Sequence, residues 1–465
     1  MLLSANYSIH TFYLLSLGCP KNEVDAECMS AALCRAGYSS TDDLYKADVL
    51  IVNTCAFIAD AVREAIDAIL DLADYKYPEG RARFLVVTGC LPQRVGRELF
   101  SEFPEVDAIL GTGEYGLIVN TIDQLRDGIS LREHQPDRPG CSGALDHLRC
   151  DRMPASKNAR WAYLKIAEGC SNTCAYCAIP SIRGPQRSRP MDEIVEEARH
   201  LESIGIRELI LVAQDTTRYG YDLTNKEQNT LTALLRRLSN ETQDIELIRC
   251  LYFYADALTE ELIREFADNP KIARYMDIPV QHASDAVLKR MRRHETRAMI
   301  EAKIASIRAA IPDVVLRTTV MVGFPGETED DIDILLDFMR SLRFDRLGSF
   351  IFCPEEGTRA ASMTDQVSSD VAFLRYNRVM ELQHDLSLEK NRSRIGTVVP
   401  VLLDGVDPHG ILFQGRSFGE APDIDPIIRV AATSPGIGIG SRPMVRIVDA
   451  GAYDMTGVTI DEYSQ

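Results

Sequence analysis

The chain has 465 residues, a length typical of two to four domains. Its 45% hydrophobic and 26% charged residues are ordinary globular values and exclude wholesale disorder. The sequence predicts neither a membrane-spanning helix nor a secretory signal, which favours the cytoplasm. A net charge of −18 disfavours broad contact with phosphate backbones and favours a cationic partner, although one basic patch could still bind nucleic acid. In such a chain the 12 cysteines are expected to be metal ligands or redox groups rather than disulfides.

Residues 9–135 show three short apolar runs, each followed by a helical pattern. The runs cover 12–17, 49–52 and 84–87, and the helical patterns cover 23–36, 59–73 and 94–103. This alternation predicts an N-terminal α/β domain with a parallel sheet. Cysteines follow all three runs, at Cys19, Cys55 and Cys90. Because ligands gather beyond the carboxyl ends of parallel strands, we expect these thiols at one edge of the sheet.

A segment rich in proline, glycine and serine, residues 136–158, is predicted to be a linker. Over residues 159–392, six further strand–helix units predict a partial TIM barrel of the (βα)6 type. Its strands are expected near 162–167, 208–213, 247–253, 275–280, 315–322 and 346–352. Residues 395–465 have short β-branched runs broken by glycine and proline, which predicts a small β-barrel.

The sharpest motif is a CxxxCxxC loop that follows the first barrel strand, with Cys170, Cys174 and Cys177. Three thiolates on a tight loop suit three irons of a cubane iron–sulfur cluster. No fourth cysteine stands at a matching spacing, so one iron would stay open to a substrate or cofactor. A zinc loop is the alternative, but zinc normally takes a fourth Cys or His nearby.

The segment KIAEGCSNTCAYCAIPSIRGPQRSRP resembles the signature loop of radical S-adenosylmethionine (SAM) enzymes. The resemblance implies a 4Fe–4S cluster whose open iron binds SAM, with Tyr176 beside it. The segments LVAQDTTRYG, YMDIPVQHASDAVLKRMRR and RTTVMVGFPGETEDD also match that group. They imply that Gln214, Gln281 and Arg317 contact SAM.

The segments GCPKNEVDAECM, VNTCAFIADAVREAI and VVTGCLPQR are similar to the N-terminal domain of methylthiotransferases. In that family three cysteines hold a second 4Fe–4S cluster, and here they correspond to Cys19, Cys55 and Cys90. Taken singly, each could be a small buried residue. The remaining cysteines are expected to be structural or merely tolerated, namely Cys28, Cys34, Cys141, Cys150, Cys250 and Cys353. No catalytic residue beyond the cluster ligands is predicted.

One branch of this family modifies adenosine in transfer RNA, and the other methylthiolates an aspartate of a small-subunit ribosomal protein. The segments CAIPSIRGPQRSRP, FDRLGSFIFCPEEGTRA and GRSFGEAPDID resemble the second branch, the last lying in a TRAM-like domain. That domain has a net charge of −5 and no lysine, which suits a basic protein better than RNA. The basic run Lys289–Arg293 favours RNA, or else supports the fold or a cofactor. The family also implies an electron donor such as a flavodoxin or ferredoxin. The alternative to an enzyme is a protein that binds a cluster as a scaffold, without turnover.

Overall fold

The computed structural model describes residues 9–138, 140, 152, 154, 159–434 and 436–460. The chain forms two compact units. The first unit holds Met1–Ala155, Lys165–Asn172 and Cys177–His200, and the second holds Ser156–Leu164, Thr173–Tyr176 and Leu201–Gln465. Most of the segment predicted as a linker, including Cys141 and Cys150, lies outside the described residues.

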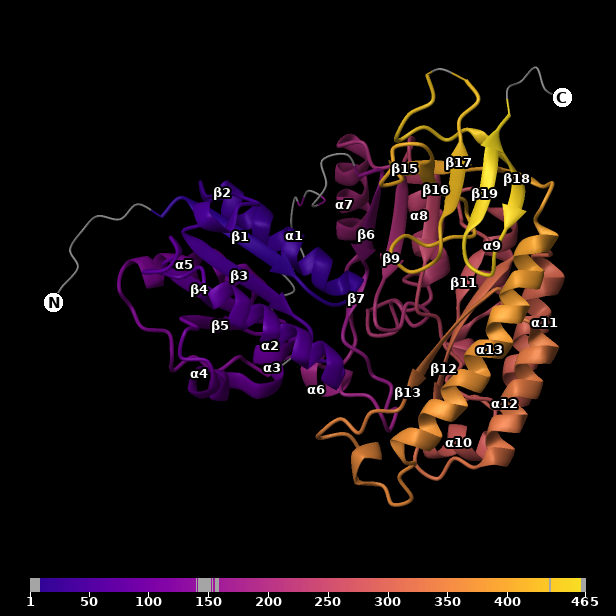
Figure 1. Ribbon diagram of the computed structural model, residues 1–465, viewed down its shortest axis with the longest axis horizontal. Helices are drawn as coiled ribbons and strands as arrows, with labels where there is room; N and C mark the ends of the chain where they lie inside the picture. Colours follow the sequence, from indigo (N-terminus) through magenta and orange to yellow (C-terminus); the bar gives the residue numbers. More distant parts are fainter. Residues whose placement is uncertain are drawn as a thin grey trace. The chain divides into compact units, whose positions relative to one another are not determined.

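The first unit contains the predicted parallel sheet, with five strands in the order β2-β1-β3-β4-β5 (Figure 1). Its strands are β1 (Thr11–Ser16), β2 (Ser39–Ser40), β3 (Val49–Thr54), β4 (Phe84–Gly89) and β5 (Ala108–Leu110), and all of them pair in parallel. In this doubly wound order the direction of winding reverses between β1 and β3. Such a switch point is where open α/β sheets bind their ligands.

Helices cover both faces of this sheet because its central strands are apolar on both sides. From β3, Val49 and Ile51 pack towards α1 (Pro20–Arg35) and α5 (Ile118–Arg126). Leu50 and Val52 pack on the other face, with α2 (Ala59–Ala73), α3 (Cys90–Val95) and α4 (Leu99–Glu102). The prediction of a single helix over residues 94–103 is wrong. Helix α3 ends before Gly96, where φ is +62°, and a 3-10 turn, Gly96–Glu98, separates it from α4.

The strands of the central region form two three-stranded sheets, in the orders β6-β9-β10 and β11-β12-β13, and the pairs β9–β10, β11–β12 and β12–β13 are parallel. Backbone hydrogen bonds link the β10 and β11 segments of the two sheets: Phe253 N donates to Asp277 O at 2.8 Å, and Ile248 N donates to Lys271 O at 2.7 Å. Six strands in sequential order make the predicted partial barrel. They are β6 (Trp161–Lys165), β9 (Glu208–Val212), β10 (Leu247–Cys250), β11 (Tyr275–Asp277), β12 (Val315–Val322) and β13 (Arg346–Ile351).

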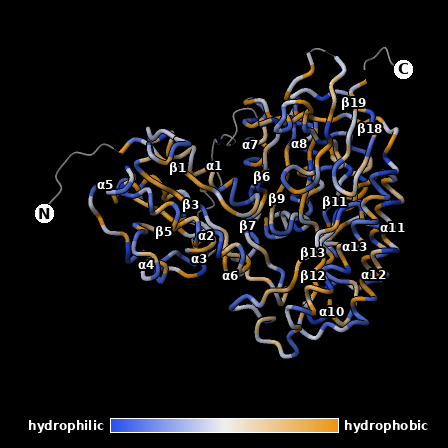
Figure 2. Tube along the Cα trace, viewed as in Figure 1, coloured by the Kyte–Doolittle hydropathy of each residue, from blue (hydrophilic) through white to orange (hydrophobic). Residues whose placement is uncertain are grey.

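Helices alternate with these strands, and many show mixed hydrophilic and hydrophobic colours along the trace (Figure 2). They are α7 (Met191–Ser203), α8 (Leu231–Glu241), α9 (Glu260–Asp268), α10 (Asp285–Arg290), α11 (Arg297–Ala310), α12 (Glu329–Leu342) and the long α13 (Ser369–Ser393). A short pair of strands, β7 (Ala167–Glu168) and β8 (Arg187–Ser188), and helix α6 (Ile179–Arg183) belong to the first unit. No helix in the described part of the chain is both long and apolar enough to span a bilayer.

The last segment forms a six-stranded sheet, in the order β14-β18-β19-β17-β16-β15. The strands are β14 (Val398–Pro400), β15 (Leu402–Val406), β16 (Phe413–Arg416), β17 (Ile428–Ala431), β18 (Met444–Ala450) and β19 (Met455–Thr459). The edge strands β14 and β15 are consecutive in the chain, and Leu403 N donates to Ser441 O at 3.0 Å just before β18. The sheet therefore curls on itself, as the prediction of a small β-barrel requires.

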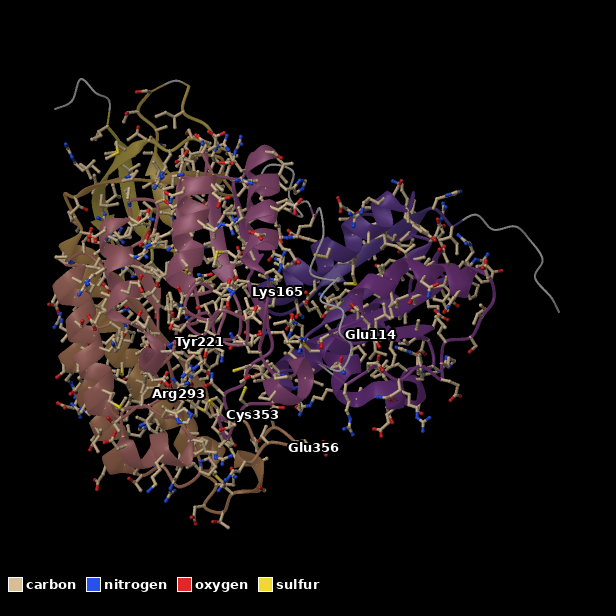
Figure 3. The ribbon with its side chains drawn as sticks, turned by 180° about the vertical axis from the view of Figure 1, so that it is seen from behind. Glu114, Lys165, Tyr221, Arg293, Cys353 and Glu356 are labelled. Carbon is tan, nitrogen blue, oxygen red and sulfur yellow. The ribbon has the colours of Figure 1, made fainter. Side chains whose placement is uncertain are left out.

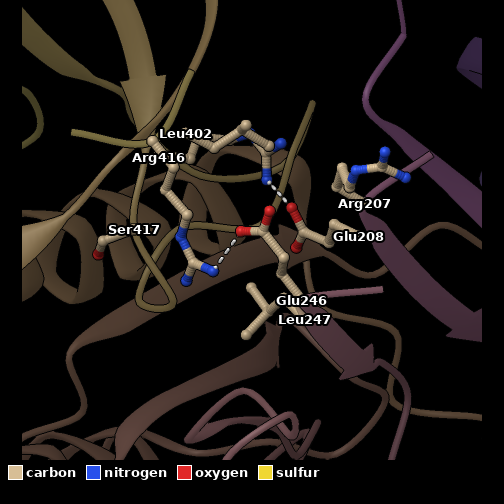
Figure 4. A pocket seen from close by; sticks show the side chains of 8 residues that line it. Arg207, Glu208, Glu246, Leu247, Leu402, Arg416 and Ser417 are labelled. Atoms are coloured by element: carbon tan, nitrogen blue, oxygen red, sulfur yellow. Dashed lines mark hydrogen bonds and ion pairs between the residues drawn. The ribbon is translucent and has the colours of Figure 1, made fainter. Parts of the chain in front are cut away.

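Residues 416–425 of this last domain, which we call the wedge segment, pack against the first residues of the barrel strands. Arg416 pairs with Glu208 of β9 at 2.8 Å (Figure 4), and Glu208 also binds Arg249 of β10 at 2.9 Å. Glu420 lies 2.6 Å from Arg394 and 3.4 Å from Arg346 of β13. Burial opposes ionisation of Glu420, but Arg394 and Arg346 outweigh it and lower its pKa to about 2.

Several acidic side chains of the last domain, including two in the wedge segment, are paired and therefore do not form a free acidic surface. Asp404 and Glu420 bind arginines, and Asp425 accepts a hydrogen bond from Tyr275 at 2.6 Å. Glu420 and Asp425 thereby hold the domain on the barrel, whereas the pair of Asp404 with Arg416 lies within the domain, so these carboxylates contribute little to an exposed acidic face. The acidic composition of the domain therefore supports a basic partner less strongly than the sequence implied.

Replacing Arg416 by methionine is expected to destabilise the second unit by about 3–5 kcal/mol, because Glu208 would stay buried with one counter-ion fewer. The midpoint of urea unfolding measures this loss. The matched control is Arg442→Met. Arg442 and Arg416 line the same small pocket (Figure 4), but Arg442 pairs with Glu246, at 2.9 Å, in a more exposed position. That exposed pair is expected to contribute less than ~1 kcal/mol. Equal shifts for the two variants would contradict the structural role of the wedge segment.

Candidate functional site

The first unit brings Cys19, Cys55 and Cys90 together at the carboxyl edge of its sheet. Cys19 follows β1 and is the N-cap of α1, Cys55 follows β3 directly, and Cys90 begins α3 directly after β4. The Sγ atoms of Cys19 and Cys90 each lie 3.9 Å from the same atom, Oδ1 of Asn22. Two of these cysteines flank the switch point between β1 and β3, so the site lies where this topology places ligands.

Two glycines allow the cysteine-bearing loops to approach one another. Gly18 has φ +95°, and a Cβ atom there would lie 2.6 Å from Cys55 Cβ and 3.2 Å from its Sγ. Gly89 has φ +96°, and a Cβ atom there would lie 2.6 Å from Thr54 O. Each glycine directly precedes a cysteine, so the Gly-Cys pairs in the sequence reflect steric need.

Asn22 ties the same loops together from within. It is fully buried, and its Nδ2 donates to Leu17 O and to Thr54 O, each at 2.9 Å. Leu17 follows β1 and Thr54 ends β3, so one carboxamide fixes the spacing of the two loops that carry Cys19 and Cys55. Sequence reasoning missed Asn22, because its partners are set by the sheet and not by nearby sequence.

The three thiols have different pKa values because their surroundings differ. Burial raises the pKa of Cys90 to about 12, in spite of the Arg183 charge. Burial and the neighbouring Cys19 also raise the pKa of Cys55. Burial opposes ionisation of Cys19 as well, but Lys21 and Arg183 outweigh it, and its pKa is lowered. Metal binding would therefore release protons from at least two of these thiols.

No group of three or more His, Cys, Asp or Glu side chains in the described residues is arranged to hold a single metal ion. The donor set at this edge, three thiols and no histidine or carboxylate ligand, is instead the type that holds iron–sulfur clusters. A cluster spreads its ligands over several irons, so its thiolates stand farther apart than those around one ion. The residues present therefore fit a three-thiolate cluster.

Replacing Gly18 by alanine is expected to displace Cys55 and to lower the iron content of the first unit. The clash should cost about 1–3 kcal/mol, in addition to the strain of a positive φ. The matched control is Gly37→Ala, since Gly37 has φ +93° but a Cβ atom there would meet no described atom within 4 Å. Iron per chain after anaerobic reconstitution and the melting temperature measure the two effects. Equal iron in both variants would contradict the steric role of Gly18.

The CxxxCxxC loop contributes to both units, so its cysteines are described separately. In the first unit, Cys170 is buried and accepts a hydrogen bond from Asn172 Nδ2 at 3.4 Å, and Cys177 accepts one from Ile179 N at 3.4 Å. Donors of this kind stabilise thiolates. The three residues remain predicted cluster ligands.

In the second unit, Cys174 faces a polar aromatic group that sequence reasoning did not single out. Its Sγ lies 4.0 Å from Tyr254 Oη, and the Arg293 guanidinium stacks 4.4 Å from the Tyr254 ring centroid. Arg293, labelled in Figure 3, is 8% exposed, and its Nε has no hydrogen-bond partner among the described residues. The basic run Lys289–Arg293 is thus not a uniform basic surface. Arg293 is buried beside the cysteine loop, although Arg290 and Arg292 are exposed.

The predicted SAM contacts lie at different positions along the barrel strands. Gln214 stands two residues beyond β9, and Gln281 follows β11 with a positive φ of +69° and pairs with Val320. A non-glycine residue with that backbone conformation is strained, as residues at binding sites often are. Tyr176 packs on the apolar cluster around Met291 and Phe324. All three contacts with SAM remain predictions.

Arg317 is the third residue of the eight in β12, far from its carboxyl end. Its Nη1 lies 2.7 Å from Asp277 Oδ1, and its Nε lies 3.7 Å from Asp425 of the wedge segment. These ion pairs give Arg317 a structural partner on each side. A contact with SAM through Arg317 also remains a prediction.

The other cysteines have mixed outcomes. Cys34, Cys250 and Cys353 are free thiols, and Cys250 is fully buried within β10. Cys28 was expected to be structural or merely tolerated, and it is disulfide-bonded. The general expectation of metal ligands or redox groups rather than disulfides was therefore wrong for this residue.

The sequence matches known families along most of the chain. Residues 11–111 match "Uncharacterized protein family UPF0004", residues 164–339 match the radical SAM superfamily, and residues 395–460 match the TRAM domain. Among solved structures, the chain resembles the radical SAM methyltransferase TsrM from Kitasatospora setae, with a TM-score of 0.51 and 15% identity over 74% of this chain and 75% of that one. This likeness supports the fold alone, and the family matches place an α/β domain before the radical SAM barrel and a TRAM domain after it.

Relatives with higher identity define the family. The chain is 45% identical to the ribosomal protein uS12 methylthiotransferase RimO of Trichlorobacter lovleyi, over 97% of this chain and 98% of the relative. It is 46% identical to the RimO protein of Geobacter sulfurreducens, over 96% and 98% of the two chains. The chain therefore belongs to the RimO family of radical SAM methylthiotransferases. Membership of the radical SAM superfamily implies a 4Fe–4S cluster and SAM as cofactors.

Proposed function

We propose that this protein transfers a methylthio group to the β-carbon of an aspartate in the small-subunit ribosomal protein uS12. The observation that carries the proposal is identity of about 45% to RimO proteins along nearly the whole of both chains. The cysteine edge of the first sheet supports it, because a methylthiotransferase needs a place to hold sulfur in addition to a radical source.

We assign Cys170, Cys174 and Cys177 to the cluster that binds SAM, and Cys19, Cys55 and Cys90 to a second 4Fe–4S cluster. The clusters with SAM supply reductive cleavage of a sulfonium, abstraction of hydrogen from an unactivated C–H bond, and sulfur insertion. The chain's own residues bind and orient the groups. Asn22 sets the spacing of two cysteine loops, and Arg293 and Tyr254 surround Cys174.

The substrate of this proposal is a basic ribosomal protein, and an electron donor such as a flavodoxin or ferredoxin supplies the reductant. Part of the acidic charge of the last domain binds the barrel, since Glu420 pairs with Arg346 and Asp425 with Arg317, so substrate choice rests on family membership more than on charge. The alternative of a transfer-RNA substrate has one supporting feature, the exposed Lys289, Arg290 and Arg292.

Mass spectrometry of ribosomal proteins from a strain that lacks this gene tests the proposal. The methylthio mass on uS12 is expected to be absent and to return on complementation with the intact chain, but not with Cys55→Ala. A normal uS12 together with a missing methylthioadenosine in transfer RNA would overturn the proposal in favour of the alternative. Absence of 5′-deoxyadenosine from purified, reduced protein with SAM would indicate a scaffold without turnover.

A further inference from the structure

A buried arginine touches the cysteine edge from an element outside the sheet. Arg183 is the last residue of α6, the helix that begins two residues after Cys177, and it is 1% exposed. Its Nη2 donates to Cys90 Sγ at 3.7 Å and to Asn22 Oδ1, the atom that both Cys19 and Cys90 face. Arg183 therefore reaches the group of thiols directly through Cys90 and indirectly through Asn22.

Arg183 belongs to a compact group of buried charges that is balanced without a ligand. Its Nη1 binds Glu168 at 2.7 Å and lies 3.4 Å from Asp25. Lys165, labelled in Figure 3, binds the same two carboxylates, and its distance to Glu168 is 2.9 Å. Two cations face two anions, and all four side chains are 1–2% exposed. Burying four charges is costly, and removing one partner would leave another charge buried without compensation.

We propose that Arg183 is a positioning residue that binds the Cys90 thiolate and raises the electron affinity of the group held by Cys19, Cys55 and Cys90. This inference rests on the proposed function, which assigns a cluster to those thiolates. Adding an electron to such a cluster makes the site more negative. A cation in a low-dielectric interior stabilises the more negative state and raises the reduction potential. Because arginine stays protonated at all accessible pH values, this effect would not vary with pH.

Arg183 lies close in the sequence to a predicted ligand of the SAM cluster. It lies six positions after Cys177, so the segment that carries a ligand of the SAM cluster also carries the cation at the second cysteine group. Both residues lie in the first unit. A change in the CxxxCxxC loop would therefore reach the Cys90 thiolate through one short helix.

The test compares two charge-balanced double variants of the full chain in a Cys174→Ala background, where only the second cluster can form. Arg183→Gln with Glu168→Gln removes one ion pair and leaves Lys165 with Asp25. The matched control, Arg189→Gln with Glu197→Gln, removes another buried pair, 2.6 Å apart, and leaves Arg152 with Glu27. Arg189 donates to Lys165 O and to Glu197. Iron content, melting temperature and the midpoint of a dithionite titration followed by EPR are measured for each variant.

We expect a more negative midpoint for the Arg183 variant, and no shift for the control, at equal iron content. Loss of iron from the Arg183 variant alone, with its melting temperature unchanged, would also support contact with the thiolate. Equal midpoints with full iron would overturn the role of Arg183 and leave the proposed function standing. Equal loss of iron from both variants would show that any buried pair has this effect, and would overturn the inference as well. An iron-free parent would overturn the ligand assignment itself and the inference with it.

Discussion

Replacing Cys174 by alanine is expected to abolish the formation of 5′-deoxyadenosine from SAM and to remove about half of the iron that the chain binds. One missing thiolate leaves an iron of the SAM cluster without a protein ligand, while the cysteine edge of the first sheet is untouched. Chromatography of reduced, reconstituted protein with SAM measures the first effect, and iron analysis measures the second.

The control for Cys174→Ala is Cys34→Ala, which removes an exposed free thiol at the end of α1. It is expected to leave both iron content and SAM cleavage unchanged. Normal SAM cleavage by Cys174→Ala would contradict the assignment of the CxxxCxxC loop.

Replacing Cys55 by alanine is expected to separate the two activities that the proposed function combines. SAM cleavage should continue, because the CxxxCxxC loop keeps all three thiolates, but no methylthio group should appear on uS12. Iron should again fall by about half. Parallel assays of 5′-deoxyadenosine and of the substrate's mass measure both outcomes in one reaction.

Cys250→Ala is the matched control for Cys55→Ala, because Cys250 is also a buried free thiol but lies within β10. Loss of its sulfur should leave iron content unchanged. Full iron in Cys55→Ala would remove the second cluster from the proposal, whatever the effect on product.

The sequence predicted best those helices and strands whose local hydrophobic pattern matches the faces that they bury in the fold. The bounds predicted for β12 and α2 match the structure. In the first sheet, β5 was missed because its three residues are too short to show a period. The helix predicted over residues 94–103 failed because Gly96 adopts a backbone conformation that a periodic pattern does not reveal.

The position of Cys19, Cys55 and Cys90 at one edge could be predicted because each follows a strand of the first sheet, and parallel strands end at one edge. Asn22, Arg183 and Arg293 could not be predicted, because their roles depend on contacts that only the folded chain makes. Asn22 and Arg183 are 161 residues apart in the sequence. A buried polar residue has no local signature, since its partners, and not its neighbours in the chain, offset the free-energy cost of burial.

The wedge segment limits how the family's modules can be exchanged. Guanidinium groups on three barrel strands, those of Arg249, Arg317 and Arg346, have partners in the last seventy residues. A shortened chain that ends at α13 would uncover these cations and a ring of strand ends, and we expect it to aggregate. If the last domain of a relative were grafted onto this barrel, that domain would need acidic residues at the positions of Glu420 and Asp425. The terminal domain therefore contributes to the stability of the barrel, and any exchange of this domain has to preserve the contacts of the wedge segment.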